Sequence, residues 1–533
     1  MADAVVVGAG PNGLVAANLL ADAGWDVLVL EAEPEPGGAV RSGETTRTGF
    51  VHDRFSSFYP LVAASPVMRA LELERHGLRL CHAEAAVAHP LGDGRAAVVY
   101  GGDLDRTCNG LEALAPGDGE AFARWMQYFE RIGHGLVEAL MSPFPPVRGA
   151  LKLGAALRTP RRMGELARLG MLPVRRFVEE EFAGEGPALL FAGNALHADY
   201  APETAGGGIY GLILVGMAQA FGYPVAEGGS SGLTAALVRR LGAAGGRIEC
   251  DARVERILLR GGRAAGVRTA DGREHRASRA VLADVGAPQL FEQLVGLEHL
   301  PPRAREGLRR FQYDHGTVKV DWALSGPVPW EAPEMARTGT VHVAESVDAL
   351  TLAMARIARR EVPERPFLVA GQYARMDPTR QPAGAETLWG YTHVPREIRG
   401  DAGGDGLRGR WDERERVAMA DRMEAELERF APGFRDRVLD RHVSAPPDLE
   451  AADANLVGGA INGGTAQLHQ QLVLRPFPGL GRAATPVPHL FLASASAHPG
   501  GGVHGACGAN AARAALRTRW ASDARRVGGL VPA

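Results

Sequence analysis

The first forty residues alternate between short apolar runs and a glycine-rich loop. Residues 4–7 are apolar and bounded by glycine, which is typical of a buried parallel strand. A helical pattern follows over residues 14–23, and Gly24 is suited to end that helix. A second apolar run over residues 27–30 predicts another strand, which stops at Glu31. This order of strand, loop, helix, strand and acid predicts the start of a Rossmann-like unit.

The loop has the spacing Gly-x-Gly-x-x-Gly, which predicts a dinucleotide site, although glycine turns also occur for steric reasons alone. The helix N-terminus would direct partial positive charge at the phosphates. Glu31 can accept hydrogen bonds from ribose hydroxyls, and its charge would repel the 2′-phosphate of NADP. The residues assigned to the dinucleotide here are Gly8, Gly10, Pro11, Asn12, Gly13, Glu31 and Ala32.

Residues 220–290 predict a return of the chain to the same unit. A glycine-rich loop leads into a helix, and strand-like runs are separated by hairpin turns at Gly261-Gly262 and Asp271-Gly272. The predicted elements are a helix over residues 233–241 and strands over residues 248–250, 254–259 and 280–283.

The end of the chain predicts another strand, glycine loop and helix. Residues 490–493 are strand-like, four glycines follow between residues 500 and 505, and residues 506–516 form an alanine-rich helical run. We therefore predict one discontinuous unit made of residues 1–89, 220–290 and 485–533. The remaining blocks, 90–219 and 291–484, are predicted to form a second unit with a mixed sheet, including strands over residues 317–324, 367–374 and 386–394.

Composition and charge narrow the classes of function. At 533 residues the chain exceeds one compact core, and its formal net charge of −3 gives no general attraction to nucleic acid. The four cysteines lie far apart, which argues against a zinc site or a dithiol centre and suits a reducing, cytoplasmic compartment. The N-terminus lacks a signal-peptide pattern, and no uncharged apolar run reaches the roughly 18 residues that a membrane span needs.

Residues 143–182 are both basic and apolar, with several prolines. Helices of this kind could rest peripherally on a membrane surface. The alternative is a solvated cap over an apolar tunnel.

A short segment after Glu31 separates the candidate cofactors. Gly37, Gly38 and Arg41 form a Gly-Gly-x-x-Arg pattern that a plain NAD domain does not require. The chain resembles the phytoene desaturase-like FAD oxidoreductases, and within them the branch typified by pyridine nucleotide-disulphide oxidoreductase domain-containing protein 2. The stretches that carry the resemblance are "GAGPNGLVAANLLADAG", "PGGAVRS", "YPVAEGGSSGLTAALVRRL", "GTVKVDWALSGPVPW", "GGAINGG" and "HPGGGVHGACGANAA".

The resemblance implies an α/β fold with a Rossmann-like, discontinuous FAD-binding domain of the amine oxidase and phytoene desaturase type. An α+β substrate domain of mixed sheet and helices would be inserted into it. Residues implied at the FAD are, besides those above, Gly37, Gly38 and Arg41 beside the diphosphate, Ser56 and Ser57 beside the isoalloxazine, Val254 facing the adenine, and Gly502, Val503 and His504 near the flavin.

The resemblance implies transfer of a hydride from a hydrophobic small molecule to flavin N5, with oxygen or a quinone as electron acceptor. A saturase, an isomerase, an amine oxidase and a non-catalytic flavoprotein remain alternatives, since one fold hosts many functions. The candidate acid–base residues are His504, His197 and Tyr200, with structural hydrogen bonding as the alternative role for each. The sequence indicates neither the substrate nor the oligomeric state.

Overall fold

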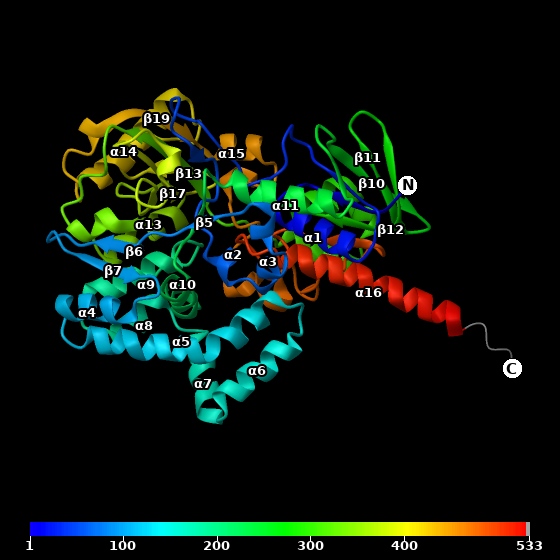
Figure 1. The fold of residues 1–533 in the computed structure, drawn as a ribbon, viewed down its shortest axis with the longest axis horizontal. Helices are drawn as coiled ribbons and strands as arrows, with labels where there is room; N and C mark the ends of the chain where they lie inside the picture. Colours follow the sequence, from blue (N-terminus) through cyan, green and yellow to red (C-terminus); the bar gives the residue numbers. More distant parts are fainter. Residues whose placement is uncertain (529–533) are drawn as a thin grey trace.

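Two seven-stranded sheets organise the chain in the computed structural model, which describes residues 1–528 and the side chains of residues 1–518. One sheet contains the N-terminal strand, and the other lies beside it with a group of helices below it in Figure 1. Residues 529–533, the end of the span predicted for the first unit, lie outside the described residues.

The first sheet is assembled from three distant parts of the chain. Its central strands are parallel, with β1 between β12 and β2, and β12 also pairs in parallel with β20. An antiparallel meander, β10–β11–β12, extends one edge. The strands are β1 (Ala2–Val7), β2 (Val27–Leu30), β9 (Arg247–Glu249), β10 (Val254–Arg260), β11 (Arg263–Thr269), β12 (Glu274–Ala283) and β20 (Leu490–Leu492).

Three helices cover one face of this sheet: α1 (Pro11–Asp22), α11 (Ser231–Ala243) and α16 (Ala506–Gly528). Helix α16 crosses α1 closely enough that a Cβ atom on Gly508 would overlap the carbonyl oxygen of Asn12. The short helices α2 (Pro60–Ala64) and α3 (Pro66–Ala70) lie between this unit and the second sheet, and α12 (Pro302–Arg309) packs under the meander.

The second sheet has the order β19–β13–β17–β16–β14–β6–β7 and is mixed, because β14 and β6 are parallel while the other pairs are antiparallel. Its strands are β6 (Ala85–Pro90), β7 (Ala96–Tyr100), β13 (Gly316–Leu324), β14 (Thr338–Val343), β16 (Leu368–Gln372), β17 (Glu386–Val394) and β19 (Val438–Ser444). Short two-stranded pairs are β3 (Ser42–Gly43) with β4 (His52–Asp53), β5 (Leu80–Cys81) with β8 (Val225–Ala226), and β15 (Glu361–Val362) with β18 (Gly400–Asp401).

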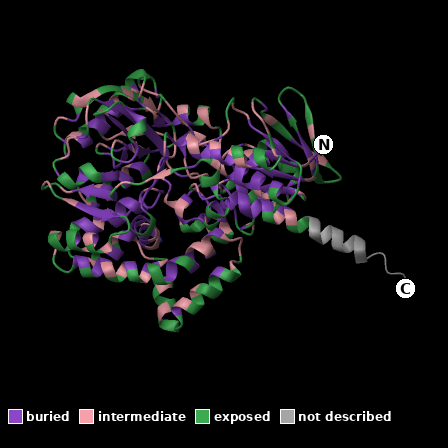
Figure 2. Cartoon of the chain, in the orientation of Figure 1, coloured by how far each residue is buried: buried purple, intermediate pink, exposed green. Residues whose placement is uncertain are grey.

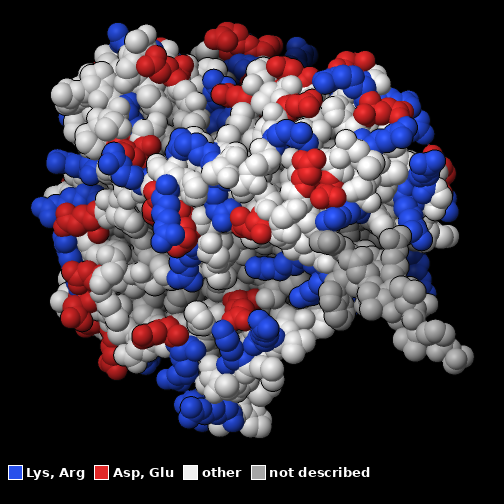
Figure 3. Space-filling model, turned by 45° about the vertical axis from the view of Figure 1, so that its right-hand side comes forward, with Lys and Arg blue, Asp and Glu red and all other residues white. Residues whose placement is uncertain are grey.

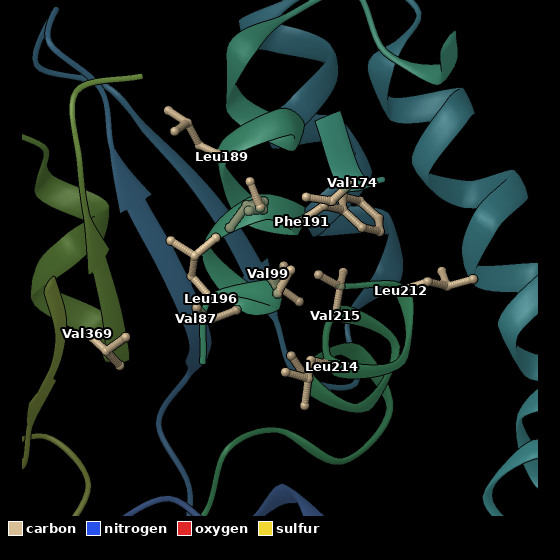
Figure 4. Packing of buried hydrophobic residues seen from close by; sticks show 14 of the residues in the cluster. Val87, Val99, Val174, Leu189, Phe191, Leu196, Leu212, Leu214, Val215 and Val369 are labelled. Carbon is tan, nitrogen blue, oxygen red and sulfur yellow. The ribbon is translucent and has the colours of Figure 1, made fainter. Parts of the chain in front are cut away.

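Helices cover both faces of the second sheet. On one face, valines of β6, β7 and β16 meet leucines and Phe191 of the helices, as Figure 4 shows. The helices around this core are α4 (Leu104–Leu114), α5 (Asp118–Met141), α8 (Val174–Glu181), α9 (Glu185–Ala195), α10 (Gly207–Phe221) and α13 (Val347–Ala358). On the other face α14 (Glu413–Glu428) packs against β13 and β17, and α15 (Pro446–Ala452) contacts β13 and β19 of the same sheet.

Two helices, α6 (Val147–Leu157) and α7 (Pro160–Leu169), project from the end of α5. Most of their residues are exposed, whereas the sheets and the central helices are largely buried (Figure 2). Across the residues searched, no helix has both the length and the apolar character needed to cross a bilayer.

The structure confirms the predicted fold class and most predicted elements. The strand predicted at 386–394 has those bounds, and the meander has the predicted turns. The division into two units stays a prediction. At its first boundary, β6 pairs with β7 and β14 in the second sheet, although the span 1–89 placed most of β6 with the first unit.

The contact between α16 and α1 generates a stability prediction. We expect Gly508→Ala to lower the free energy of unfolding by roughly 1–3 kcal/mol, since the added Cβ must separate two packed backbones. Gly110→Ala, on the exposed part of α4 where a Cβ would meet nothing, should stabilise by about 0.5–1 kcal/mol. Urea unfolding of both variants would measure the difference. An unaffected Gly508→Ala variant would contradict the packing described here.

Candidate active site

A cavity of about 460 Å³ lies where the two sheets meet. Its volume is within the usual range of small-molecule sites. Segments that are hundreds of residues apart in the chain contribute to its wall. They lie within residues 7–12, 30–33, 38–41, 55–61, 253–254, 284–294, 449–463, 494–496 and 501–503, together with residues of α10, β13, β16 and β17.

The glycine loop at the start of α1 forms one end of the cavity. Gly8 has a φ of 93°, which favours glycine. A Cβ on Gly10 would stand 2.6 Å from a carboxylate oxygen of Asp284, and a Cβ on Gly13 would overlap the carbonyl oxygen of Gly8. The loop residues Gly8, Gly10, Pro11 and Asn12 line the cavity, and Gly13 packs behind them.

Asp284 supports this loop and was not assigned from the sequence. It follows β12 directly, and its Oδ2 accepts a hydrogen bond of 2.8 Å from the Gly13 N–H. Burial, together with the nearby carboxylates of Asp453 and Glu31, raises the pKa of Asp284 to about 8. Asp284 is therefore mostly protonated at pH 7 and adds little negative charge beside the loop. The only sequence signal was an acid immediately after the strand predicted at 280–283.

Glu31 lies at the same end of the cavity with Ala32 and Val254. The Ala9 N–H donates to Glu31 Oε2 at 2.6 Å, and the Glu33 N–H donates to Oε1 at 3.0 Å. Each carboxylate oxygen keeps a second lone pair, so both can still accept a hydrogen bond from a ribose hydroxyl.

The Gly-Gly-x-x-Arg segment packs on the glycine loop. A Cβ on Gly38 would stand 3.1 Å from the Gly10 Cα, and a Cβ on Gly37 would stand 2.8 Å from the Val40 carbonyl oxygen. Gly38 lines the cavity, whereas Gly37 shapes the turn behind it.

Arg41 brings a cation to the wall of this part of the cavity. Its Nε donates to the Gly38 carbonyl at 2.9 Å and its Nη2 donates to the Ala452 carbonyl at 2.5 Å. Its guanidinium also lies over the Phe55 ring at 5.4 Å. The side chain is only 5 % exposed, so these contacts fix its position.

The middle of the cavity is bounded by Ser56 and Ser57. Ser56 Oγ donates to the Ala39 carbonyl at 2.8 Å. Trp389 Nε1 donates to Ser57 Oγ at 3.2 Å, and Ser57 also bonds to the Tyr373 hydroxyl. These bonds connect the first sheet's loops to strand β17.

Behind Tyr373 lies a buried ion pair. The Tyr373 hydroxyl donates to Asp53 Oδ2 at 2.7 Å, and Arg380 pairs with the same carboxylate at 2.8 Å. Burial alone would raise the pKa of Asp53, but the charge of Arg380 together with hydrogen bonds from Arg380, Tyr373 and the Ser230 N–H lowers that pKa. Asp53 therefore stays ionised and anchors the middle of the cavity wall.

The far end of the cavity is an aromatic chamber lined by Phe58, Tyr210, Leu214, Trp389 and Tyr391. Trp389 and Tyr391 are two positions apart on β17, so they share a face of the sheet. Their rings stack with centroids 6.1 Å apart and an angle of 5° between planes.

Two polar groups reach this chamber. Lys319, on β13, is buried and paired with Asp321, whose pKa this ammonium and His52 lower despite burial. His197 lies 2.5 Å from His342 between their Nε2 atoms. Burial lowers the pKa of His197 to about 3 and that of His342 well below its usual value, so both rings are neutral at pH 7.

The other two candidate acid–base residues do not line the cavity. The Tyr200 hydroxyl donates to the Ala466 carbonyl at 2.5 Å, and burial raises its pKa above the usual range. His504 Nδ1 accepts a hydrogen bond of 3.0 Å from the Ala506 N–H in the first turn of α16, and burial lowers its pKa to about 4. Both placements favour the structural alternative that the sequence left open.

The loop before α16 completes the wall. Gly502, with a φ of 105°, and Val503 line the cavity opposite the Ser57 segment. Ser494 and Ala495, which follow β20, line it as well. The N-terminal loop, the middle segment at Val254 and the C-terminal loop thus face one space.

These residues fit a bound dinucleotide. The glycines leave a cradle that side chains would fill, and the Asn12 Oδ1 is buried without a hydrogen-bond partner among the described residues. Arg41 and the α1 N-terminus supply positive potential for a diphosphate, and Glu31 supplies acceptors for a ribose.

Comparison with known proteins shows a Rossmann-like segment, the fold of amine oxidase structures and similarity to known oxidoreductases. Residues 6–72 match the NAD(P)-binding Rossmann-like domain. The solved structure of cyclohexylamine oxidase from Brevibacterium oxydans has the same fold, with a TM-score of 0.59, 16% identity and coverage of 97% of this chain and 99% of that one.

Two known proteins are similar in sequence to this chain over nearly its whole length. Mouse pyridine nucleotide-disulfide oxidoreductase domain-containing protein 2 is 29% identical over 97% of this chain and 93% of its own. The lycopene-forming phytoene desaturase of Pseudescherichia vulneris is 25% identical over 97% of this chain and 99% of its own. The expected resemblance to the phytoene desaturase-like proteins is confirmed over nearly the whole length.

The unusual state of Asp284 generates a pH prediction. Its folded pKa of about 8 is above that of an unfolded aspartate, so its contribution to stability is complete below about pH 4 and is lost as the pH rises toward 8. Asp284→Asn keeps an acceptor for the Gly13 N–H but cannot ionise. We expect this variant to gain stability over the natural protein between pH 5 and pH 8, by at most about 1.4 kcal/mol per pH unit.

Urea unfolding at several pH values would measure this difference. Asp105→Asn, at an exposed carboxylate on α4, serves as the control and should keep a constant difference from the natural protein. Parallel pH profiles for Asp284→Asn and the natural protein would show that Asp284 does not bind its proton more tightly in the fold.

Proposed function

We propose that the protein is an FAD-dependent oxidoreductase that takes a hydride from an apolar small molecule, with oxygen or a quinone as the final electron acceptor. One observation carries this proposal: a single cavity joins a dinucleotide cradle to an aromatic chamber. A dehydrogenase needs its cofactor and substrate in one continuous, water-poor space.

The extent of the cradle favours FAD over NAD. The cavity continues from Glu31 past Arg41 and Ser57 to Gly502 and Val503. The resemblance places the flavin ring near Ser57, Gly502 and Val503. Bound there, FAD would supply the hydride acceptor, and the protein would supply position and electrostatics.

Residues of the cradle have distinct tasks in binding. Arg41 and the N-terminus of α1 offset the diphosphate charge, and protonated Asp284 removes a repulsion that an ionised carboxylate would add. Glu31 orients the ribose. Gly502 allows the C-terminal loop to approach the ring, and the N-terminus of α16 directs partial positive charge toward that loop.

The chamber favours an apolar substrate. Trp389, Tyr391 and Leu214 exclude water and offer flat apolar surface. The neutral His197–His342 pair can accept or hold a proton without bringing a charge. Among the described lining residues, the carboxylates are Glu31, Glu33, Asp284 and Asp453, and all four lie at the cradle end.

Amine oxidation is the second candidate, and the stacked pair of Trp389 and Tyr391 is the observation that favours it, because parallel aromatic rings can flank a slot for an uncharged amine. The lack of a chamber carboxylate among the described residues disfavours it, since such a group would attract a protonated amine from water.

A saturase or an isomerase would use the same chamber. A non-catalytic flavoprotein is disfavoured by the continuous opening between chamber and cradle.

Anaerobic mixing of the FAD-loaded protein with polyene hydrocarbons, alcohols and amines tests the proposal. We expect the polyenes to bleach the oxidised flavin absorption. Tyr391→Leu should slow this bleaching by about tenfold, through loss of aromatic contact with the substrate, while FAD content stays unchanged.

Tyr128→Leu, on α5 outside the cavity, is the matched control and should bleach at the natural rate. Bleaching by amines alone would replace the leading proposal with amine oxidation. No bleaching by any of the three substrate classes would contradict the proposed reaction.

A further inference from the structure

The α6–α7 hairpin (residues 147–169) stands apart from the rest of the molecule. It projects below α5 in Figure 1 and is mostly exposed in Figure 2. One side of it is anchored, since Leu157 packs with Ile132 and Leu136 of α5, and Leu153 and Leu166 lie against the same cluster. The apolar residues of that inner side account for the attachment of the hairpin, and the outer side is left to solvent.

The outer side of the hairpin is also apolar, which is unusual for an exposed helix. On α6, Val147, Leu151 and Ala155 follow one another at intervals of four residues, and Val147 and Leu151 are 58 % and 70 % exposed. On α7 and just after it, Met163 and Met171 are 55 % and 64 % exposed. Side chains four residues apart share one face of a helix, so α6 carries a continuous apolar stripe toward solvent.

Basic side chains accompany these exposed apolar residues. The segment 143–171 contains six basic residues and a single acidic one. Within the described part of the chain, Arg148, Arg158 and Arg162 have no carboxylate at ion-pair distance. Figure 3 shows Lys and Arg side chains gathered at the lowest part of the molecule, where α7 lies.

We propose that the α6–α7 hairpin docks on an anionic lipid surface, with its apolar side chains in the interfacial layer and its arginines at the lipid phosphates. An apolar stripe flanked by arginine and lysine is the arrangement that lies in a membrane interface. A second copy of this chain fits the surface less well, because two hairpins with the same excess of positive charge would repel each other.

The α6–α7 hairpin lies next to a groove that borders the active-site cavity, so docking on a membrane would bring this groove to the bilayer. A groove of about 1460 Å³ runs between α5, α6 and α16, with apolar side chains such as Met126, Phe129 and Phe144 and a basic rim that includes Arg148. The short helix α2 borders both spaces, since Leu61 lines the cavity and Ala64 lines the groove. If the proposed function holds, an apolar substrate would pass from the bilayer through this groove.

Co-sedimentation of the full chain with lipid vesicles tests the docking without any substrate. We expect binding to vesicles that mix phosphatidylcholine with phosphatidylglycerol, weaker binding at high salt, and little binding to phosphatidylcholine alone. Leu151→Glu/Met163→Glu and, separately, Arg148→Gln/Arg158→Gln/Arg162→Gln should each lower the partition coefficient at least about tenfold.

Matched controls use equivalent residues elsewhere on the surface. Leu352→Glu, at a half-exposed leucine of α13, and Arg256→Gln/Arg260→Gln/Arg263→Gln, on the exposed meander, should bind vesicles as the natural chain does. Thermal unfolding and FAD content would show that every variant is folded.

Equal binding to neutral and anionic vesicles, or no binding, would overturn the docking proposal. So would hairpin variants that bind as well as the controls. An oligomer in solution that the Leu151→Glu/Met163→Glu change dissociates, together with no vesicle binding, would assign the surface to a second copy instead. Failure here would leave the proposed function untouched, because that function is read from flavin bleaching in the absence of lipid.

Discussion

The structure depends on the close approach of bare backbone at the start of α1. Gly8, Gly10 and Gly13 lie against Asp284 from β12, and Gly508 of α16 lies against Asn12 from the other side. A Cβ on Gly13 or Gly508 would overlap backbone oxygens, a Cβ on Gly10 would meet the Asp284 carboxylate, and the positive φ of Gly8 favours glycine. The constraint brings the N-terminal strand, a middle strand and the last helix to one place, and the cavity exists because these three pieces meet there.

Negative charge around the glycine loop is limited by protonation of a carboxyl group as well as by ion pairs. Glu31, Asp284 and Asp453 surround the loop, and burial together with mutual repulsion raises the pKa of Asp284. Its protonated form still accepts from the Gly13 N–H, so the loop is held without an added negative charge. Arg41 is fixed by two carbonyl oxygens and an aromatic ring, and its Nη1 also lies 3.8 Å from the half-exposed Glu35 carboxylate. In the chamber, the neutral histidine pair and the Lys319–Asp321 pair achieve a similar balance.

The cradle could be predicted from the sequence because its information is local. The glycine spacing, the acid after the second strand and the Gly-Gly-x-x-Arg segment each occupy a few consecutive residues, and the structure brings Gly10, Glu31 and Gly38 to one cavity. The strand at 386–394 was also predicted with its observed bounds.

The chamber could not be predicted in the same way. Every position of β17 except one is buried, so an alternating pattern does not distinguish the face that carries Trp389 and Tyr391 toward the cavity. Asp284 meets Gly13 across 271 residues of chain, and no local pattern encodes that contact. His504 was drawn into the candidate list by its place in a glycine loop, but its ring turns toward the Ala506 N–H. The direction in which such a side chain points is set by partners that are distant in the sequence, and a local pattern does not show them.

The binding of FAD itself is the most direct test of the account. The purified chain, freed of any bound cofactor, would be titrated with FAD while flavin absorption and fluorescence are followed. We expect saturation at one FAD per chain, no displacement by an equal concentration of NAD, and loss of binding in a folded Gly10→Val variant, whose side chain would fill the cradle beside Asp284. A folded natural protein that binds no FAD, or one from which NAD displaces it, would contradict the central claim.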